Sequence, residues 1–95
     1  METAGFVLRL NDAGRLAPRP VRVQLKVVGK GQRPLFMLIV RRLGAVSERL
    51  CYGRTDARVL VDALIERIKV DAVDRDFLIV FECDVLRYSC LDATL

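Results

Sequence analysis

The chain of 95 residues contains no histidine and only two serines. Without histidine it lacks the most common general base, the most common metal ligand and every nucleophile that depends on a histidine partner. Neither Ser47 nor Ser89 lies in a nucleophile-elbow pattern. We therefore expect a protein that is not an enzyme and that takes no small-molecule substrate.

Long apolar runs are also missing. The longest, Leu35–Val40, has six residues, whereas a membrane-spanning helix needs roughly 20. The first residues show no basic leader followed by an apolar run, the pattern of a signal peptide. Cys51, Cys83 and Cys90 are spaced too widely for a zinc site. We expect a cytoplasmic protein with no membrane partner, whose reduced cysteines pack as small hydrophobic residues.

Carboxylates are densest towards the end of the chain: Asp71, Asp74, Asp76, Glu82 and Asp84. Their spacing does not match the calcium-binding loop between two helices. We expect residues 71–76 to form a solvated acidic loop, with no metal and no cofactor. Glu82 interrupts an apolar strand and is the one candidate for a perturbed acid–base group. The simpler prediction for Glu82 is an outward or edge position paired with an arginine.

Alternating apolar and polar residues predict a mainly antiparallel sheet. The alternation is cleanest in 21–28, where Arg22, Gln24 and Lys26 share the polar face. Segments 35–42 and 77–83 are apolar on both faces, as central strands are. Weaker strand signals cover 5–10, 48–54 and 84–91. Two prolines predict an extended connector over 15–20.

One amphipathic helix is predicted from about Asp56 to Val70, because apolar residues recur there at steps of three and four. Thr55 or Asp56 is suited to cap its first turn. The order is β-β-β-β-α-β-β. We predict one domain, 1–95, of the α+β class, with five to six strands and the helix on one face of the sheet.

Hydrophobic residues make up 53% of the chain, above the roughly 45–50% usual for soluble domains. One helix cannot cover both faces of a sheet, so we expect the other face to bind a second copy or a protein partner. The first hypothesis is a self-associating interaction module: an adaptor, an assembly subunit or an inhibitor. An apolar face and an edge near the C-terminus supply its candidate residues. These are Leu35, Met37, Ile39, Leu78, Val80 and Tyr88.

Charge is unevenly distributed, with a net +7 in residues 1–42 and −3 in residues 43–95. A stripe of cations can follow a phosphate backbone, so nucleic-acid binding is the second hypothesis. The candidate residues are Arg9, Arg22, Lys26, Lys30, Arg33, Arg41 and Arg42. Aromatic residues are not interleaved with these cations, as they are in proteins that bind single strands. A solvated sheet face or a protein-facing patch fits the same pattern. The sequence Gly29-Lys30-Gly31 predicts a hairpin turn and not a phosphate loop.

Overall fold

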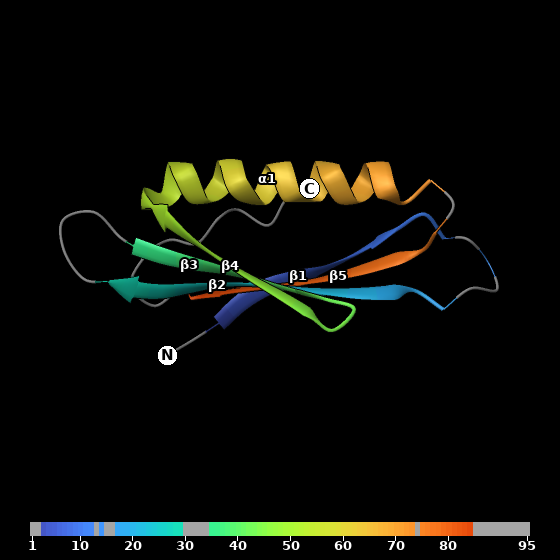
Figure 1. Ribbon diagram of the computed structural model, residues 1–95, viewed down its shortest axis with the longest axis horizontal. Helices are drawn as coiled ribbons and strands as arrows, with labels where there is room; N and C mark the ends of the chain where they lie inside the picture. The colour runs from blue at the N-terminus through green and yellow to red at the C-terminus, as the bar shows by residue number, and fades with distance from the viewer. Residues whose placement is uncertain (1–2, 13, 15–16, 30–34, 74, 85–95) are drawn as a thin grey trace.

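Four strands, a long helix and a fifth strand follow one another along the chain (Figure 1). The computed structural model describes residues 3–12, 14, 17–29, 35–73 and 75–84. The elements are β1 (Thr3–Leu10), β2 (Arg19–Gly29), β3 (Leu35–Arg42), β4 (Ala45–Tyr52), α1 (Gly53–Asp71) and β5 (Phe77–Asp84). The predicted α+β class is confirmed. Nearly all of the strand predicted over 84–91 lies outside the described residues.

The five strands form one sheet in the order β1-β5-β2-β3-β4. Neighbouring strands are antiparallel except β2 and β5, which are parallel. The helix carries the chain from the β4 edge back across the sheet, and β5 then enters between β1 and β2. Because β5 is apolar on both faces, an interior position between two strands suits it.

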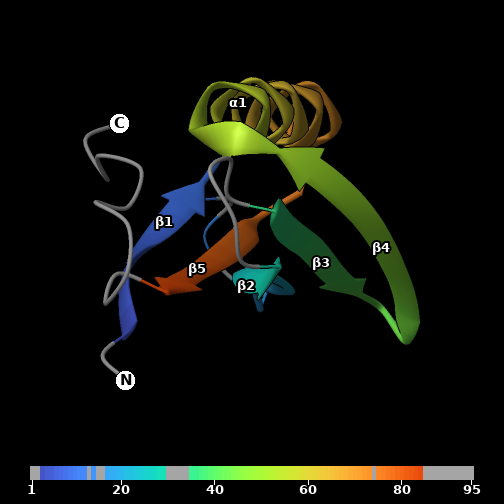
Figure 2. The ribbon, with the colours of Figure 1, turned by 90° about the vertical axis from the view of Figure 1, so that its left-hand side faces the viewer.

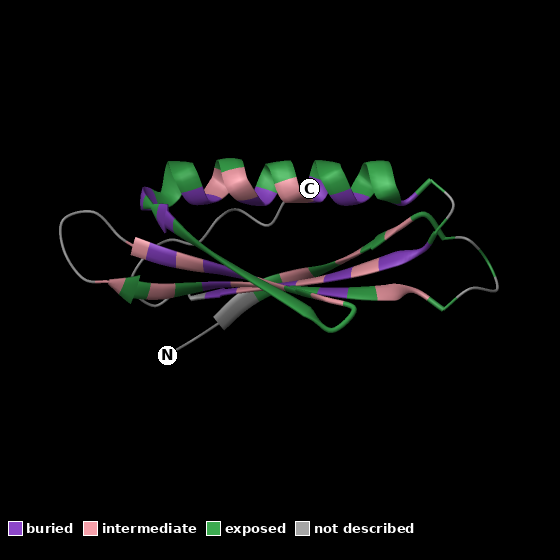
Figure 3. Ribbon diagram, in the orientation of Figure 1, coloured by how far each residue is buried: buried purple, intermediate pink, exposed green. Residues whose placement is uncertain are grey.

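The helix lies over one face of the curved sheet, and β1 and β4 form the two edges of the sheet (Figure 2). Figure 3 shows the buried residues on the underside of the helix and along the strands beneath it. On β2, Val21, Val23 and Leu25 are at most 2% exposed. The rings of Phe6 and Phe81 stack with centroids 5.0 Å apart on the same side of the sheet. The apolar residues that the alternation predicted for one face of β1 and β2 therefore belong to the core.

Helix α1 begins earlier than predicted, at Gly53, directly after β4. Tyr52 is the N-cap residue and makes no side-chain capping bond, so the cap predicted at Thr55 or Asp56 is wrong. Gly53 has φ 87°, a conformation that glycine adopts at little cost and that turns the strand into the helix without a loop. The predicted apolar stripe is confirmed by four buried side chains. They are Ala57, Val61, Ile65 and Ile68.

Two predicted strand boundaries are wrong. Leu43 and Gly44 have φ 48° and 80°, which fits a two-residue hairpin turn, so β4 begins at Ala45 without a longer break. The predicted connector also ends early, because Arg19 and Pro20 already belong to β2. The amide of Arg19 donates to the carbonyl of Asp76 at 2.7 Å. Successive backbone N–H groups of a strand point to opposite neighbouring strands. The amide of Arg19 points towards β5, so the nitrogen of Pro20 points towards β3, beyond its last paired residue. The missing N–H of Pro20 therefore removes no hydrogen bond from the sheet.

The helix of the described residues is too polar to cross a membrane. Of the predicted reduced cysteines, Cys51 is a free thiol, buried on β4. Cys90 lies outside the described residues. Cys83 is buried on β5.

Candidate functional site

The sheet has an open face, which we define as the side turned away from α1. Within the described ranges no helix or strand lies over it (Figure 2). The strand register places five of the predicted interface residues on this face. They are Leu35, Met37, Ile39, Leu78 and Val80. All are half-buried except Ile39, which is 7% exposed. The sixth, Tyr88, lies outside the described residues.

An apolar strip runs along β3 and β4 on the open face. It consists of Leu35, Met37, Ile39, Leu50 and Tyr52, with Leu35 opposite Tyr52 and Met37 opposite Leu50. The side chains from the edge strand are the most accessible, at 44% for Leu50 and 55% for Tyr52. The sequence analysis predicted a weak strand over 48–54 but did not count these two residues as part of an interface. The signal that would have found them is the pairing of that strand with apolar β3.

A second apolar pair lies on the other side of the open face. Val7 on β1 is directly opposite Val80 on β5, and Val7 is 65% exposed. Between this pair and the apolar strip runs β2, whose open-face side chains are Arg22, Gln24 and Lys26. The open face is therefore two apolar areas divided by a polar strand.

Gln24 links three strands at the centre of this polar strand. Its amide nitrogen donates to Oε2 of Glu82 at 3.3 Å, and its amide oxygen accepts a hydrogen bond from Arg41. Glu82 points to the open face, as predicted, but its partner is a glutamine and not an arginine. Since β2 lies between β5 and β3, Gln24 reaches both neighbours.

Four of the predicted basic residues lie on the open face by register: Arg9, Arg22, Lys26 and Arg41. Arg22 and Arg41 are direct cross-strand neighbours, and Lys26 is opposite Met37. Lys30 and Arg33 lie outside the described residues. Among the described residues, Arg22, Lys26 and Arg41 form a patch of cations on the adjacent strands β2 and β3, whereas Arg9 lies on β1.

Arg42 does not belong to this patch. It lies on the helix-facing side, where it donates to Asp71 at 3.2 Å and its guanidinium carbon is 5.0 Å from the ring centroid of Phe77. Its direction follows from the strand itself, since consecutive residues alternate between faces and Arg41 occupies the open side.

Arg9 was expected to extend the basic face of β2, but β5 separates β1 from β2. Its Nε donates to Oδ2 of Asp76 at 2.9 Å, and it also lies 3.2 Å from Asp12. The bond to Asp76 raises the pKa of Arg9. Arg9 is therefore held in a local ion pair.

Asp76 contradicts the prediction of a solvated acidic loop, because it is 1% exposed. Its backbone carbonyl accepts from β2, and one carboxylate oxygen accepts from Arg9. Nearby, the side chain of Asn11 donates to the carbonyls of Val73 and Arg75 at 3.0 and 3.1 Å. These bonds tie the start of β5 to β1 and β2. Within the part of the chain that the structure describes, no three metal-ligating side chains lie together.

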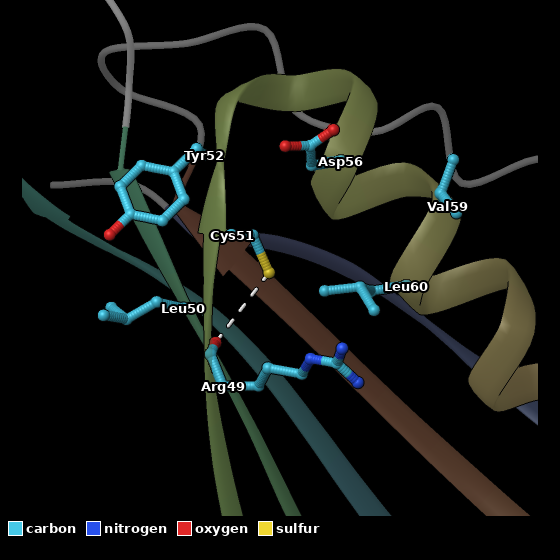
Figure 4. A pocket seen from close by; sticks show the side chains of 7 residues that line it. All are labelled: Arg49, Leu50, Cys51, Tyr52, Asp56, Val59 and Leu60. Atoms are coloured by element: carbon cyan, nitrogen blue, oxygen red, sulfur yellow. Dashed lines mark hydrogen bonds between the residues drawn. The ribbon is translucent and has the colours of Figure 1, made fainter.

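A groove runs between α1 and the edge strand β4. Two cavities of about 310 and 430 Å³ lie along it, and both are lined by Arg49 and Leu60. In the first, Cys51 and Leu60 face each other below the start of the helix, while Leu50 and Tyr52 lie on the far side of β4 (Figure 4). Burial raises the pKa of the Cys51 thiol, which favours an unreactive neutral group.

Comparison with protein-family models, with curated proteins and with solved structures finds no match for this chain. Its function is therefore argued from the geometry of the open face and of the groove.

Proposed function

We propose that this protein is a non-enzymatic interaction module that self-associates through the apolar strip of its open face. The observation that carries the proposal is the strip itself, which no described element covers. Apolar strips of this kind lose contact with water when two sheets pack about 10 Å apart. A cytoplasmic location is part of the proposal and is supported by the free thiol of Cys51.

The polar strand β2 limits how much of the face two copies can share. Burying Arg22 beside Arg41 would remove two neighbouring like charges from water, which is costly without partners. A contact centred on β3 and β4 leaves these arginines at the rim. The ring of Tyr52 can then pack against the second copy while its hydroxyl stays in water.

The test is the molar mass in solution, measured by light scattering after size exclusion over a series of protein concentrations. Wild-type protein is expected to be a dimer, and Met37→Glu a monomer. The matched control is Val7→Glu, which places the same charge on the same face outside the apolar strip and leaves the dimer intact. A wild-type monomer at every concentration up to about 1 mM rejects the proposal, since stable association requires tighter binding.

A second candidate function is nucleic-acid binding by Arg22, Lys26 and Arg41. It is favoured by the direct opposition of Arg22 and Arg41, two like charges that a phosphate backbone would neutralise. Three phosphate contacts on duplex DNA predict that affinity falls about 40-fold between 50 and 200 mM salt. Fluorescence anisotropy at the two salt concentrations measures this. Absence of binding at 50 mM removes the candidate.

A further inference from the structure

The outer edge of β4 has no neighbouring strand in the part of the chain that the structure describes. Among the described residues β4 pairs only with β3, from Ala45 to Tyr52. The ladder with β3 has no bulge, and every residue of β4 except Cys51 is exposed. Proline and bulges, which commonly prevent another chain from pairing with an edge strand, are absent from β4. Alternate residues therefore direct unpaired N–H and C=O groups towards solvent.

The cavity nearest the start of α1 lies against this edge. Its lining includes side chains from both faces of β4: Arg49 and Cys51 on the helix side, Leu50 and Tyr52 on the open side (Figure 4). A strand added beside β4 would have side chains alternating between these two surroundings. The helix-side positions would enter the groove, where the second cavity continues over Leu38 and Leu64.

The larger cavity has an apolar floor and a basic rim, whereas Asp56 lines the smaller cavity. Arg49 on β4 and Arg67 on α1 both line the larger cavity. Within the described ranges no carboxylate lies within 4.0 Å of either guanidinium. Several other charges on the helix are paired, for example Arg58 with Asp62 and Lys69 with Glu66. An occupant with an acidic side chain at this point would complement two available arginines.

A second copy of this chain fits the edge poorly. If the β4 strands of two copies paired edge to edge, a two-fold axis would relate them and the pair would be antiparallel. Residues directly opposite in an antiparallel pair share a face, so the axis must pass beside one residue, which then lies opposite the same residue of the other copy. In the two central registers this residue is Glu48 or Arg49. Either register places like charges directly opposite, which destabilises the pair.

From the edge of β4, which no described strand pairs, the two-sided cavity and the two arginines that no described carboxylate pairs, we propose that the β4–α1 groove binds an extended segment of a different protein. The segment adds a strand to β4. Its groove-side residues are apolar, with one acidic residue that pairs with Arg49 and Arg67. This site is a different surface from the apolar strip proposed for self-association, although Leu50 and Tyr52 border both surfaces.

The probe is a fluorescein-labelled, blocked octapeptide of alternating threonine and valine, with glutamate in place of the second valine. Its binding is followed by anisotropy. Arg49→Ala or Arg67→Ala is expected to weaken binding by up to about fivefold, the range of a solvent-accessible ion pair. Arg49→Glu should abolish binding of this peptide and restore it for a peptide carrying lysine instead of glutamate. Arg54→Ala, an exposed arginine outside both cavities, is the control and leaves binding unchanged.

Strand addition is tested separately with peptides N-methylated at either the odd or the even residues. Only one of the two edges of the peptide faces β4, so one set should weaken binding at least about tenfold and the other should be tolerated. Equal loss or equal tolerance overturns strand addition. No binding of any peptide at 1 mM, or equal binding of the glutamate and lysine peptides, overturns the site. Met37→Glu, which lies outside the groove, should retain peptide binding whether or not the protein self-associates.

Discussion

Arg9 on β1 donates from its Nε to Oδ2 of Asp76 across 2.9 Å, just before β5 begins. The side chain of Asp76 has no exposed surface, whereas that of Arg9 is 45% exposed. The other carboxylate oxygen, Oδ1, is buried and has no partner among the described residues. Arg9 is therefore the described side chain that pairs with the buried carboxylate of Asp76, and the pair fastens β1 to the start of β5.

The first prediction follows from this pair. Arg9→Met keeps an apolar stem but leaves the carboxylate of Asp76 buried without its partner, which is strongly unfavourable. We expect the urea midpoint, measured by circular dichroism, to fall clearly. Asp12→Asn removes only the exposed contact of the same arginine, at 3.2 Å, and should leave the midpoint nearly unchanged. Equal midpoints for the two variants would show that the buried pair contributes no more than the exposed one.

The second prediction concerns the two faces of α1. Ile68 has no exposed surface and Val70, two residues later, is 72% exposed. Ile68→Ala should lower the free energy of unfolding by about 2–5 kcal/mol, because it leaves a cavity between helix and sheet. Val70→Ala should change it by less than about 0.5 kcal/mol. Urea titrations of the two variants measure both values, and a small effect at Ile68 would mean that the helix is not packed as described.

Local alternation was enough to predict most of the fold. The faces of β2, the two apolar strands and the helix stripe all follow from residues two, three or four apart. The position of β5 between β1 and β2 depends on contacts between distant segments, which no local pattern contains. The start of α1 was missed because the positive φ of Gly53 replaced a polar cap. Asp76 was misplaced because its partner, Arg9, lies 67 positions away.

The candidate surfaces were predicted less completely. The open-face positions of Leu35, Met37, Ile39, Leu78 and Val80 follow from strand alternation once one face is assigned to the helix. The predicted basic patch included Arg42, which lies on the helix-facing side, because Arg41 and Arg42 were counted together although neighbours on a strand face opposite ways. The groove could not be predicted, because it depends on where α1 lies relative to β4.

The third prediction concerns the like charges of Arg22 and Arg41, which are direct cross-strand neighbours. Arg22→Glu replaces a repulsive pair with an attractive one, so we expect the free energy of unfolding to rise by roughly 0.2–1 kcal/mol at low salt. Added salt should reduce the gain. Lys26→Glu is the control, because its neighbour on β3 is Met37. A loss of stability in Arg22→Glu but not in Lys26→Glu would contradict the prediction.

The last prediction concerns Cys51, whose pKa is raised by burial. The unfolded thiol ionises near pH 8.5, while the folded thiol stays neutral to higher pH. Its contribution to stability is therefore complete below about pH 8.5. This contribution to the free energy of unfolding is lost as the pH rises from about 8.5 towards the pKa of Cys51 in the folded protein, by up to about 1.4 kcal/mol per pH unit.

Urea titrations at pH 7, 8, 9 and 10 measure this contribution. Cys51→Ala is expected to be less stable than wild type at pH 7, and the difference should shrink at pH 9 and 10. Taking the difference between the two proteins cancels the titration of every group they share. Alkylation of Cys51 by iodoacetamide, followed by mass spectrometry, should be much slower in native protein than in urea. Parallel curves from pH 7 to 10, or equally fast alkylation in both states, would show that the thiol between β4 and α1 is accessible to solvent.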